Sequence, residues 1–537
     1  MTISLLNIIA KVCEKAVFKY LFNYIRDFAI LTLHQSGFVP NDSTVHQLVY
    51  LYNTFCKALN DKKDIRIIFC DQTKAFDRVW HDGLIFKLQT IGISGTLLTW
   101  FKSYLSGRKQ RVVIEGKFSP WGSIGAGVPQ GSVLGPLLFL IYINDITENT
   151  KSNIKLFADD TTLYVSFENI EEATAQLDDD LSTIRDWANQ WIVSFNPTKT
   201  KSLLVTLKRN LVPPPLHFDG QRLDEVKCHK HLGIHLNSTL TWKDHITYIA
   251  ENTNKKLNIL SSLSHTLDRK TLLVMYNSFI RPCLEYGNIL WSNCTDEEDE
   301  ILESVQRRAA RIISGAIIRT NSLNLYQEVA FETLKTRRER NMLLFFHKIA
   351  YGTAPNYLIE LLPATRDNRY NLRRQHDFPL IKCRINKYQN SFIPKAITLW
   401  NRQDAHLKTI ADYDTFKDEL IKNSPKENTL YYTGKRKENI IMARLRLNCS
   451  NLKGHLYNLH IIDRPECQCG HDFEDSFHFF FICPLYNRPR VIFQNTITNF
   501  APFTLKTVLF GREYLPENTN SEIFQATIKF ISESKRF

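Results

Sequence analysis

Three carboxylates in the first third of the chain stand where they could hold metal ions. Asp71 follows an apolar, strand-forming run at 65–70, and Asp159-Asp160 separates two further strand-forming runs. Adjacent carboxylates in a tight turn repel each other, and a hard divalent cation such as Mg²⁺ offsets that repulsion. Two such ions about 4 Å apart can activate a hydroxyl and stabilise a leaving pyrophosphate. The pattern therefore predicts a site for two Mg²⁺ ions at Asp71 and Asp159, with Asp160 contributing charge or an outer contact.

A more ordinary interpretation stays open for the second acidic position, because two solvated acids in a turn arise readily by chance. The sequence context favours a built site. An acid ends an apolar strand well before the pair, and the turn-rich stretch Gly127-Val-Pro-Gln-Gly131 lies between them.

These residues need a sheet to position them. Strand-forming runs alternate with helical patterns over the first 210 residues, which indicates an α/β domain. We expect a helix pair over 1–30 and helices over 82–104 and 170–190. Expected strands cover 65–70, 111–115, 154–157, 161–166 and 201–206. From residue 240 onward the apolar periodicity becomes helical.

Composition limits the function classes. The 537 residues include 68 Lys and Arg against 55 Asp and Glu, a net charge of +13, and 43% are hydrophobic. This excludes a disordered or collagen-like chain and fits a polyanionic partner. The longest apolar run, 133–143, is too short to cross a bilayer. Eleven mostly scattered cysteines indicate a reducing compartment.

Ordered motifs over about residues 1–240 resemble the reverse transcriptases of non-LTR (LINE-type) retrotransposons, especially the jockey-like and chicken-repeat-like branches. The matching stretches are Gln35-Ser-Gly-Phe38, Phe69-Cys-Asp-Gln-Thr-Lys-Ala-Phe-Asp-Arg-Val79, Gly127-Val-Pro-Gln-Gly-Ser-Val-Leu-Gly-Pro136, Tyr142-Ile-Asn-Asp145, Phe157-Ala-Asp-Asp160, Asn196-Pro-Thr-Lys-Thr200 and His231-Leu-Gly-Ile-His235.

The resemblance implies an RNA-directed DNA polymerase that extends a DNA primer on an RNA template with dNTPs. Its fold would be a right hand of the α/β (α+β) class. The expected parts are partial fingers and palm at 1–236, a helical thumb or connection at 237–365, a basic module and linker at 366–428, and a helix-rich C-terminal region with a knuckle at 429–537. The resemblance further implies an intracellular location, in cytoplasmic ribonucleoprotein particles and the nucleus.

The resemblance also assigns roles to single residues. Asp71, Asp159 and Asp160 would be the catalytic acids. Phe76 would be the steric gate that excludes a 2′-hydroxyl, and Gln130 and Gly131 would line the nucleotide pocket. Lys199 would lie near the triphosphate as a proton donor. His231-Leu-Gly233 resembles the hairpin that grips the primer strand.

The opening of the chain departs from the family pattern. It reads Met1-Thr-Ile-Ser-Leu-Leu6, without the arginine that contacts the triphosphate in the family. We therefore expect a chain truncated at its N-terminus, lacking the upstream fingers and the endonuclease domain. The alternative function is a catalytically impaired, nucleic-acid-binding remnant of such an element.

A Cys-Cys-His-Cys pattern lies near the C-terminus. Cys467, Cys469, His478 and Cys483 provide three thiolates and one imidazole, a set that suits tetrahedral Zn²⁺. The family resemblance supports such a knuckle. His471 is a competing ligand, and scattered buried cysteines are the alternative. A zinc-dependent RNA-binding protein is a third candidate function.

Basic stretches suggest contacts with nucleic acid. Residues 301–348 hold nine Lys and Arg against four Asp and Glu, which would suit a thumb that follows a phosphate backbone. A solvated helical face is the alternative. Near the knuckle, arginines and aromatic residues could contact RNA or belong to the core: Arg444, Arg446, Arg488, Arg490, Tyr457 and Phe479 to Phe481.

Overall fold

The computed structural model describes residues 6–363 and 376–537 and divides the chain into two compact units. Unit 1 comprises residues up to 244 together with 345–411. Unit 2 comprises 245–344 and 412–537. The opening Met1 to Leu5 and part of the expected basic module, 364–375, lie outside the described residues.

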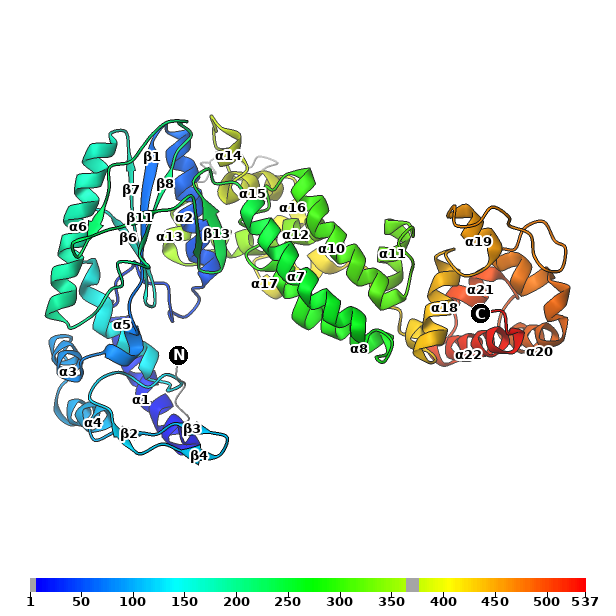
Figure 1. The fold of residues 1–537 in the computed structure, drawn as a ribbon, viewed down its shortest axis with the longest axis horizontal. Coiled ribbons are helices and arrows are strands. Elements are labelled where there is room, and N and C mark those ends of the chain that lie inside the picture. The colour runs from blue at the N-terminus through cyan, green and yellow to red at the C-terminus, as the bar shows by residue number, and fades with distance from the viewer. Residues whose placement is uncertain (1–5, 364–375) are drawn as a thin grey trace. The chain divides into compact units, whose positions relative to one another are not determined.

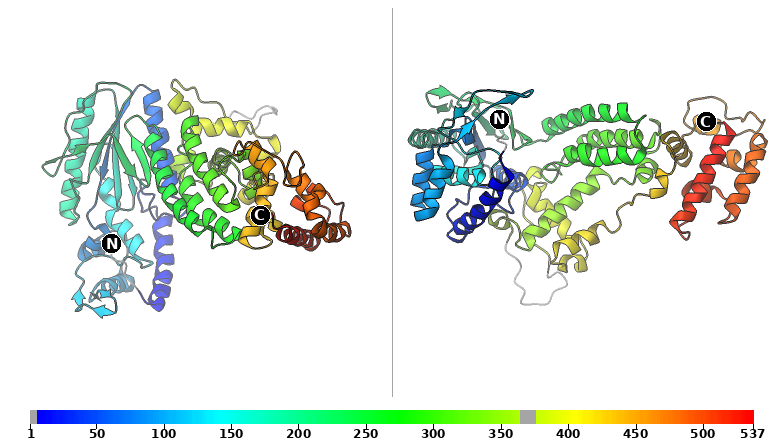
Figure 2. Two further views of the ribbon diagram at one scale, coloured as in Figure 1. Left: turned by 45° about the vertical axis from the view of Figure 1, so that its right-hand side comes forward. Right: turned by 90° about the horizontal axis from the view of Figure 1, so that it is seen from below.

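Unit 1 is built on a five-stranded sheet with the order β11-β8-β1-β7-β6. The strands are β1 Asp64–Cys70, β6 Asn153–Phe157, β7 Asp160–Phe167, β8 Lys201–Val205 and β11 Asp224–Glu225. Every residue of β1 is buried, because β1 is central and helices cover both of its faces. Helix α6 (Ile170–Gln190) lies on one face and α2 (Thr44–Asn60) on the other (Figure 1 and Figure 2).

Several predicted elements are confirmed. The expected strands at 65–70, 154–157, 161–166 and 201–206 correspond to β1, β6, β7 and β8, and the helix at 170–190 is α6. The predicted single helix over 82–104 is wrong. It is two helices, α3 (His81–Thr90) and α4 (Gly95–Leu105), which separate at Gly92, where φ is +93°.

Two other predictions near the N-terminus also need correction. The described part of 1–30 forms one helix, α1 (Ile8–Asp27), rather than a pair. The strand expected at 111–115 belongs to two small ribbons, β2 (Lys109–Gln110) with β5 (Gly122–Ser123) and β3 (Val113–Ile114) with β4 (Lys117–Phe118). These strands are exposed, so tertiary packing does not extend them.

The remaining elements of unit 1 complete its core and its surface. They are α5 Gly135–Ile143, β9 His217–Phe218, β10 Gln221–Arg222, β12 Cys228–His231, β13 Ile234–Asn237, α13 Asn356–Ile359, α14 Asn386–Gln389, α15 Phe392–Asn401 and α16 Ala405–Thr409. The late helices α13, α14 and α15 all contact α2. Ser391 Oγ donates a hydrogen bond to Asn53 Oδ1 (3.1 Å), and the Arg384 guanidinium donates to the carbonyl oxygens of Leu59 and Asn60 at the end of α2.

Unit 2 is helical, as expected for the sequence after residue 240. Its helices are α7 Lys243–Leu263, α8 Arg269–Met275, α9 Arg281–Glu285, α10 Asp296–Ser314, α11 Ser322–Val329, α12 Leu334–Ala350, α17 Tyr413–Ile421, α18 Arg436–Arg446, α19 Lys453–Asn458, α20 Asn487–Thr498, α21 Leu505–Phe510 and α22 Glu517–Ser534. Helices α7 and α12 extend into unit 1 at one end. A phenylalanine-rich core joins α18, α20, α21 and α22.

Candidate active site and metal centre

The three predicted acids meet where β1 ends beside the β6–β7 hairpin. Cys70 is paired with Thr161 across β1 and β7, so the next positions, Asp71 and Asp160, are opposite each other. Phe157 is paired with Asp160, which leaves Ala158 and Asp159 as a two-residue turn. The antiparallel register therefore gathers all three carboxylates at one edge of the sheet, as the sequence predicted.

The electrostatics of this cluster show that the acids repel one another. Desolvation, then repulsion by Asp159 and Asp71, raises the pKa of Asp160 to about 6. The pKa of Asp159 is also raised, mainly by desolvation and further by Asp71. A divalent cation would lower the energy of three ionised groups held in this way, so the donor set fits Mg²⁺.

The loop that carries Lys199 is fastened to Asp71. The backbone N–H of Asn196 donates to the carbonyl oxygen of Asp71 (2.8 Å), and the Asp71 N–H donates to Thr200 Oγ1 (3.3 Å). Lys199 Nζ lies 3.9 Å from Asp71 Oδ2, and both side chains are substantially exposed. The lysine is thus beside the acid cluster with its ammonium accessible to a ligand.

Phe76 is held in a short 3₁₀ turn, Ala75–Arg78, directly after β1. Its half-buried ring stacks on Phe139 of α5 with centroids 4.4 Å apart, and Phe38 meets it edge-on at 6.1 Å. The Val128 N–H donates to the Phe76 carbonyl oxygen (2.9 Å). At Gly127, where φ is +93°, a Cβ would press on the backbone of the 3₁₀ turn at Asp77, so glycine permits this close approach.

Gln130 lines a cavity of about 360 Å³ between the 3₁₀ turn and the 127–130 stretch. Gly131 follows with φ +104° and is exposed. The loop is anchored by buried Glu14 of α1, whose carboxylate accepts the N–H groups of Val133 (2.6 Å) and Leu134 (3.2 Å).

Three cations that the sequence reasoning missed also line this cavity: Lys74, Arg78 and Arg108. Two of them could have been found from the sequence, because Lys74 and Arg78 lie inside the motif that contains Asp71 and Phe76. Asp77 is the one acidic residue among the described residues that line the cavity. The cavity is therefore suited to an anionic ligand such as a polyphosphate.

The His231-Leu-Gly233 motif lies in the hairpin of β12 and β13. Its turn residues, Leu232 and Gly233, have φ values of +45° and +85°, as a tight two-residue turn requires. His231 is buried against Phe69 of β1, and its Nε2 lies 3.5 Å from Thr162 Oγ1. Burial and the neighbouring His229 lower the pKa of His231 to about 3, so its ring is neutral near pH 7.

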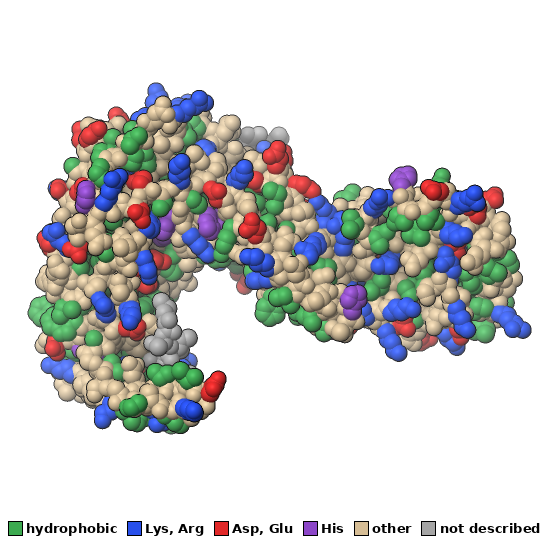
Figure 3. All heavy atoms as spheres, viewed as in Figure 1, with side chains coloured by type: hydrophobic (Ala, Val, Ile, Leu, Met, Phe, Trp, Pro, Cys, Tyr) green, Lys and Arg blue, Asp and Glu red, His purple; other side chains and the backbone are tan. Residues whose placement is uncertain are grey.

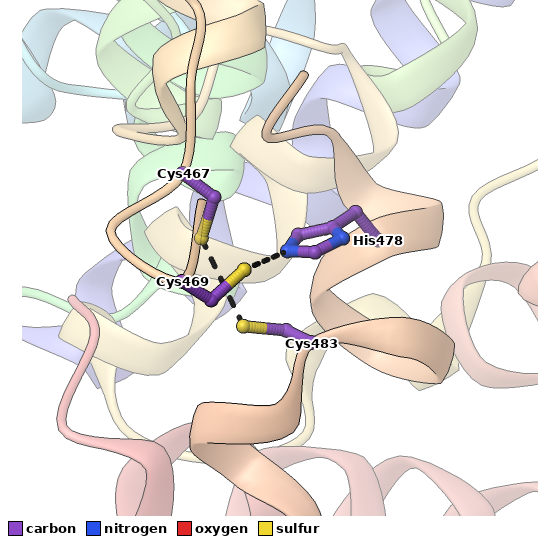
Figure 4. A group of neighbouring side chains, drawn as sticks. All are labelled: Cys467, Cys469, His478 and Cys483. Atoms are coloured by element: carbon purple, nitrogen blue, oxygen red, sulfur yellow. Dashed lines mark hydrogen bonds between the residues drawn. The ribbon is translucent and has the colours of Figure 1, made fainter. Parts of the chain in front are cut away.

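The four residues of the Cys-Cys-His-Cys pattern converge in unit 2. Their ligand atoms all lie within 4.8 Å of one another (Figure 4). The sulfurs of Cys467 and Cys483 are 3.8 Å apart, and Cys469 Sγ is 3.3 Å from His478 Nε2. Three of the four residues are buried. The competing ligand His471 is exposed, and its Nδ1 is engaged by Phe473.

The segment that presents two of these ligands is fixed by Arg490. His478 begins a π-helical turn, His478–Ile482, which ends at Cys483. Buried Arg490 of α20 donates to the carbonyl oxygens of Phe480 (2.9 Å) and Cys483 (2.5 Å). Arg490 thereby satisfies backbone acceptors that the end of the turn leaves open.

The RNA contacts expected of Arg446 and Arg490 are wrong, and for Phe479 and Phe480 the alternative of a core position is confirmed. All four are buried; the two rings belong to the core, and the guanidinium of Arg446 pairs with Glu328. Much of the positive charge in 301–348 is likewise neutralised within unit 2. There Arg307, Arg337, Arg338 and Arg340 pair with Glu300, Glu285, Asp299 and Glu332.

The sheet, the gathered carboxylates and the motif order can be compared with those of known proteins. Residues 1–249 match the family model for reverse transcriptase (RNA-dependent DNA polymerase), so this part of the chain is similar to that family.

Its curated relatives are the polymerases of non-LTR retrotransposons. The chain is 30% identical over 354 residues to the probable RNA-directed DNA polymerase from transposon BS of Drosophila melanogaster, covering 63% of this chain and 39% of that protein. It is 30% identical over 324 residues to that from mobile element jockey of the same species, covering 58% and 35%. The chain thus spans well under half the length of these relatives.

Solved structures resemble the chain only distantly. Telomerase from Candida tropicalis in complex with a fragment of telomeric RNA aligns at 13% identity with a TM-score of 0.35, covering 80% of this chain and 56% of that one. Separately, no helix among the described residues is both long and apolar enough to cross a membrane.

Proposed function

We propose that this protein is an RNA-directed DNA polymerase that adds dNTPs to a primer 3′-hydroxyl on an RNA template. The observation that carries the proposal is the meeting of Asp71, Asp159 and Asp160 at one sheet edge, inside a reverse transcriptase domain. The positive net charge and the relatives' names support nucleic acid as the substrate class.

Asp71 and Asp159 would hold the Mg²⁺ ions, with Asp160 beside them. When bound, these ions supply Lewis acidity at the attacking and leaving oxygens. The protein's own contribution is to fix the carboxylates through the β1–β7 register and the two-residue turn. Lys199, beside Asp71, would hold a proton close to the leaving pyrophosphate.

The cavity next to the 3₁₀ turn would receive the incoming nucleotide. Phe76, fixed by its stacking on Phe139, would lie under the sugar and exclude a 2′-hydroxyl. Gln130 and Gly131 would border the base pair that forms, and the three cations lining the cavity would bind phosphate oxygens.

Primer extension tests this function. The full chain is supplied with an RNA template, a DNA primer, Mg²⁺ and dNTPs, and is compared with its Asp159→Asn variant. We expect extension by the wild type and its loss in the variant. Asp186→Asn is the matched control, because Asp186 is an exposed acid of α6 that is not part of the cluster. Absence of extension by the wild type would contradict the proposal.

We further propose that the Cys-Cys-His-Cys cluster holds a structural Zn²⁺ ion. With Zn–S bonds of about 2.3 Å, tetrahedral geometry requires sulfurs about 3.8 Å apart, and the Cys467–Cys483 separation is 3.8 Å. A disulfide would need about 2.05 Å. Four closely spaced ligand atoms that are mostly buried leave no open coordination position, as in a structural site.

Metal analysis of the full chain tests the zinc proposal. One Zn²⁺ per chain is expected in the wild type and in Cys13→Ser, where the cysteine is exposed and outside the cluster. Cys467→Ser should lose the metal and melt at a lower temperature. A wild-type chain without metal, with a melting temperature insensitive to a chelator, would refute the site.

A further inference from the structure

A groove of unit 2 lies where the end of α10 meets α18. It has a volume of about 920 Å³, and its lining combines isoleucines with five arginines: Arg308, Arg311, Arg319, Arg436 and Arg444. None of the described residues that line it is acidic. We call this the arginine groove. Figure 3 shows Lys and Arg side chains gathered over the region that α10 and α11 occupy in Figure 1.

Three of these arginines also hold the fold together. Arg436 donates to the carbonyl oxygens of Ile312 (2.6 Å) and Ile313 (2.5 Å), Arg319 donates to Leu459 (2.5 Å), and Arg444 Nε donates to Gly315 (2.7 Å). The bonds from Arg436 and Arg444 satisfy the carbonyl oxygens at the end of α10. Carbonyl groups carry no net negative charge, however. The positive charge of the groove therefore stays uncompensated by the residues that line it.

The pKa of Arg436 is lowered to about 10, mainly by burial. Repulsion from Arg269, which does not line the groove, and from Arg444 adds to this and outweighs the attraction of Asp268. An anion in the groove would relieve the same repulsion.

Two arginines have donors left for a ligand. Arg311 Nε is buried and has no hydrogen-bond partner within the described part of the chain. Arg444 donates a hydrogen bond through Nε only. No described residue accepts a hydrogen bond from its two terminal nitrogens. An unmatched buried donor is costly, so Arg311 Nε favours an acceptor supplied from outside the protein, and the partly buried Arg444 has its terminal nitrogens free to bind one.

The ligand that matches this chemistry is a run of phosphates. Several guanidinium groups in one elongated groove suit repeated anionic oxygens, and isoleucines can contact sugars and base faces. We propose that the arginine groove binds the phosphodiester backbone of a nucleic-acid strand, using residues that take no part in the carboxylate site. The choice of nucleic acid over other polyanions rests on the proposed polymerase function.

The test measures binding of two labelled probes to the full chain by fluorescence anisotropy, without Mg²⁺ or dNTPs, across a series of salt concentrations. The probes are a 20-nucleotide single-stranded RNA and a 20-base-pair DNA duplex. The double variant Arg311→Gln/Arg444→Gln is compared with Arg209→Gln/Arg222→Gln, which removes two exposed arginines of unit 1.

We expect the groove variant to bind about tenfold more weakly than the control at 0.1 M salt. Its salt slope should fall by about 1.4 for RNA or about 1.8 for the duplex. A loss with one probe alone identifies the strand type, and a loss with both identifies the shared backbone. Arg311→Lys/Arg444→Lys should restore most of the salt slope because it keeps the charge.

Two further variants make the result decisive. Ile318→Glu places a carboxylate at an exposed lining position, where the side chain is 81% exposed, and should weaken binding without disturbing the core. In the Asp159→Asn background, which lacks polymerase activity, adding the groove substitutions should lower the salt slope by the same amount, so a polymerase failure is distinguishable from a groove failure. Equal affinity and slope in the groove variants and the control would overturn the proposal.

Discussion

Gln35 accepts two backbone hydrogen bonds through Oε1, from the N–H of Gly37 (2.7 Å) and from that of Ala158 (2.9 Å). Ala158 precedes Asp159 in the turn of the acid hairpin and has φ +53°. The buried glutamine thus ties the Gln35-Ser-Gly-Phe38 loop to the turn that presents the Asp159 carboxylate. A Cβ on residue 37 would overlap the backbone nitrogen of Ala158, so the loop can come this close to the turn only because residue 37 is glycine.

Gln35→Met should misplace the acid turn. It leaves the N–H groups of Gly37 and Ala158 without their acceptor, which costs about 2 kcal/mol in the free energy of unfolding. Because small misplacements of reacting groups lower rates strongly, single-turnover extension should slow about tenfold or more. Template affinity should not change. Gln190→Met, at an exposed position, is the control; equal rates in the two variants would refute the role of Gln35.

Phe76→Val should weaken sugar discrimination. Removing the ring opens space beside Phe139, so a ribose 2′-hydroxyl would be accommodated. We expect the preference for dNTP over rNTP, measured as a ratio of kcat/KM values, to fall about 10- to 100-fold. Phe86→Val, at a position 59% exposed on α3, should retain the preference. An unchanged ratio in Phe76→Val would show that the ring is only a core residue.

Acid should destabilise unit 1 through His231. Its pKa is lowered from 6.5 to about 3 in the folded state, so the unfolded chain binds the proton more readily. Stability is therefore full above pH 6.5 and declines as the pH falls towards 3. Between pH 6.5 and 4.5 this group alone would remove about 2 kcal/mol from the free energy of unfolding.

The comparison for that prediction is His231→Gln, which keeps a polar group near Thr162 but does not titrate. Urea unfolding should show a shallower loss of stability with acid in the variant than in the wild type. His455→Gln is not a suitable control, because the pKa of His455 is also lowered, to about 4, by burial. A suitable control is His217→Gln, because His217 is exposed on β9. Parallel pH profiles for His231→Gln and the wild type would contradict the assignment.

A buried charge cluster should dominate the stability of unit 2. Glu328 accepts hydrogen bonds from Arg269 (2.6 Å) and Arg446 (2.6 and 2.8 Å), and all three side chains are buried. Glu328→Gln leaves two buried guanidinium groups without their counter-charge, which should lower the free energy of unfolding by about 3–5 kcal/mol. Glu300→Gln, which breaks an exposed pair with Arg307, should cost under about 1 kcal/mol. Chemical denaturation of the two variants separates these outcomes.

The sequence was informative where structure depends on local pattern. The apolar run of β1 and the two strand-forming runs of β6 and β7 predicted these strands, and the position of the acids beside one another follows from the antiparallel pairing. The helix over 82–104 failed because its periodicity continues through Gly92, where a positive φ ends the first helix. The prediction that Arg446 and Arg490 contact RNA failed for another reason. Charge patterns do not distinguish a guanidinium that pairs inside the core from one that faces solvent.

Residues 345–411 could not be assigned from sequence, because their partners are distant along the chain. Ser391 bonds to Asn53, and Arg384 bonds to the end of α2, across more than 300 residues. No periodicity within either segment records such a contact. The same reasoning applies to the arginine groove, whose lining comes from α10, α18 and the loops near them.

The late return of 345–411 to unit 1 has a consequence for how the protein is made. While the ribosome is still translating the first 340 residues, the face of α2 that later contacts α13, α14 and α15 has no cover. Nascent chains would therefore carry an incomplete unit 1 through most of synthesis, with apolar surface available to chaperones. Closing contacts of such long sequence separation is slow. Premature stop codons before residue 411 should thus yield aggregation-prone fragments, even though Asp71, Asp159 and Asp160 have already been translated.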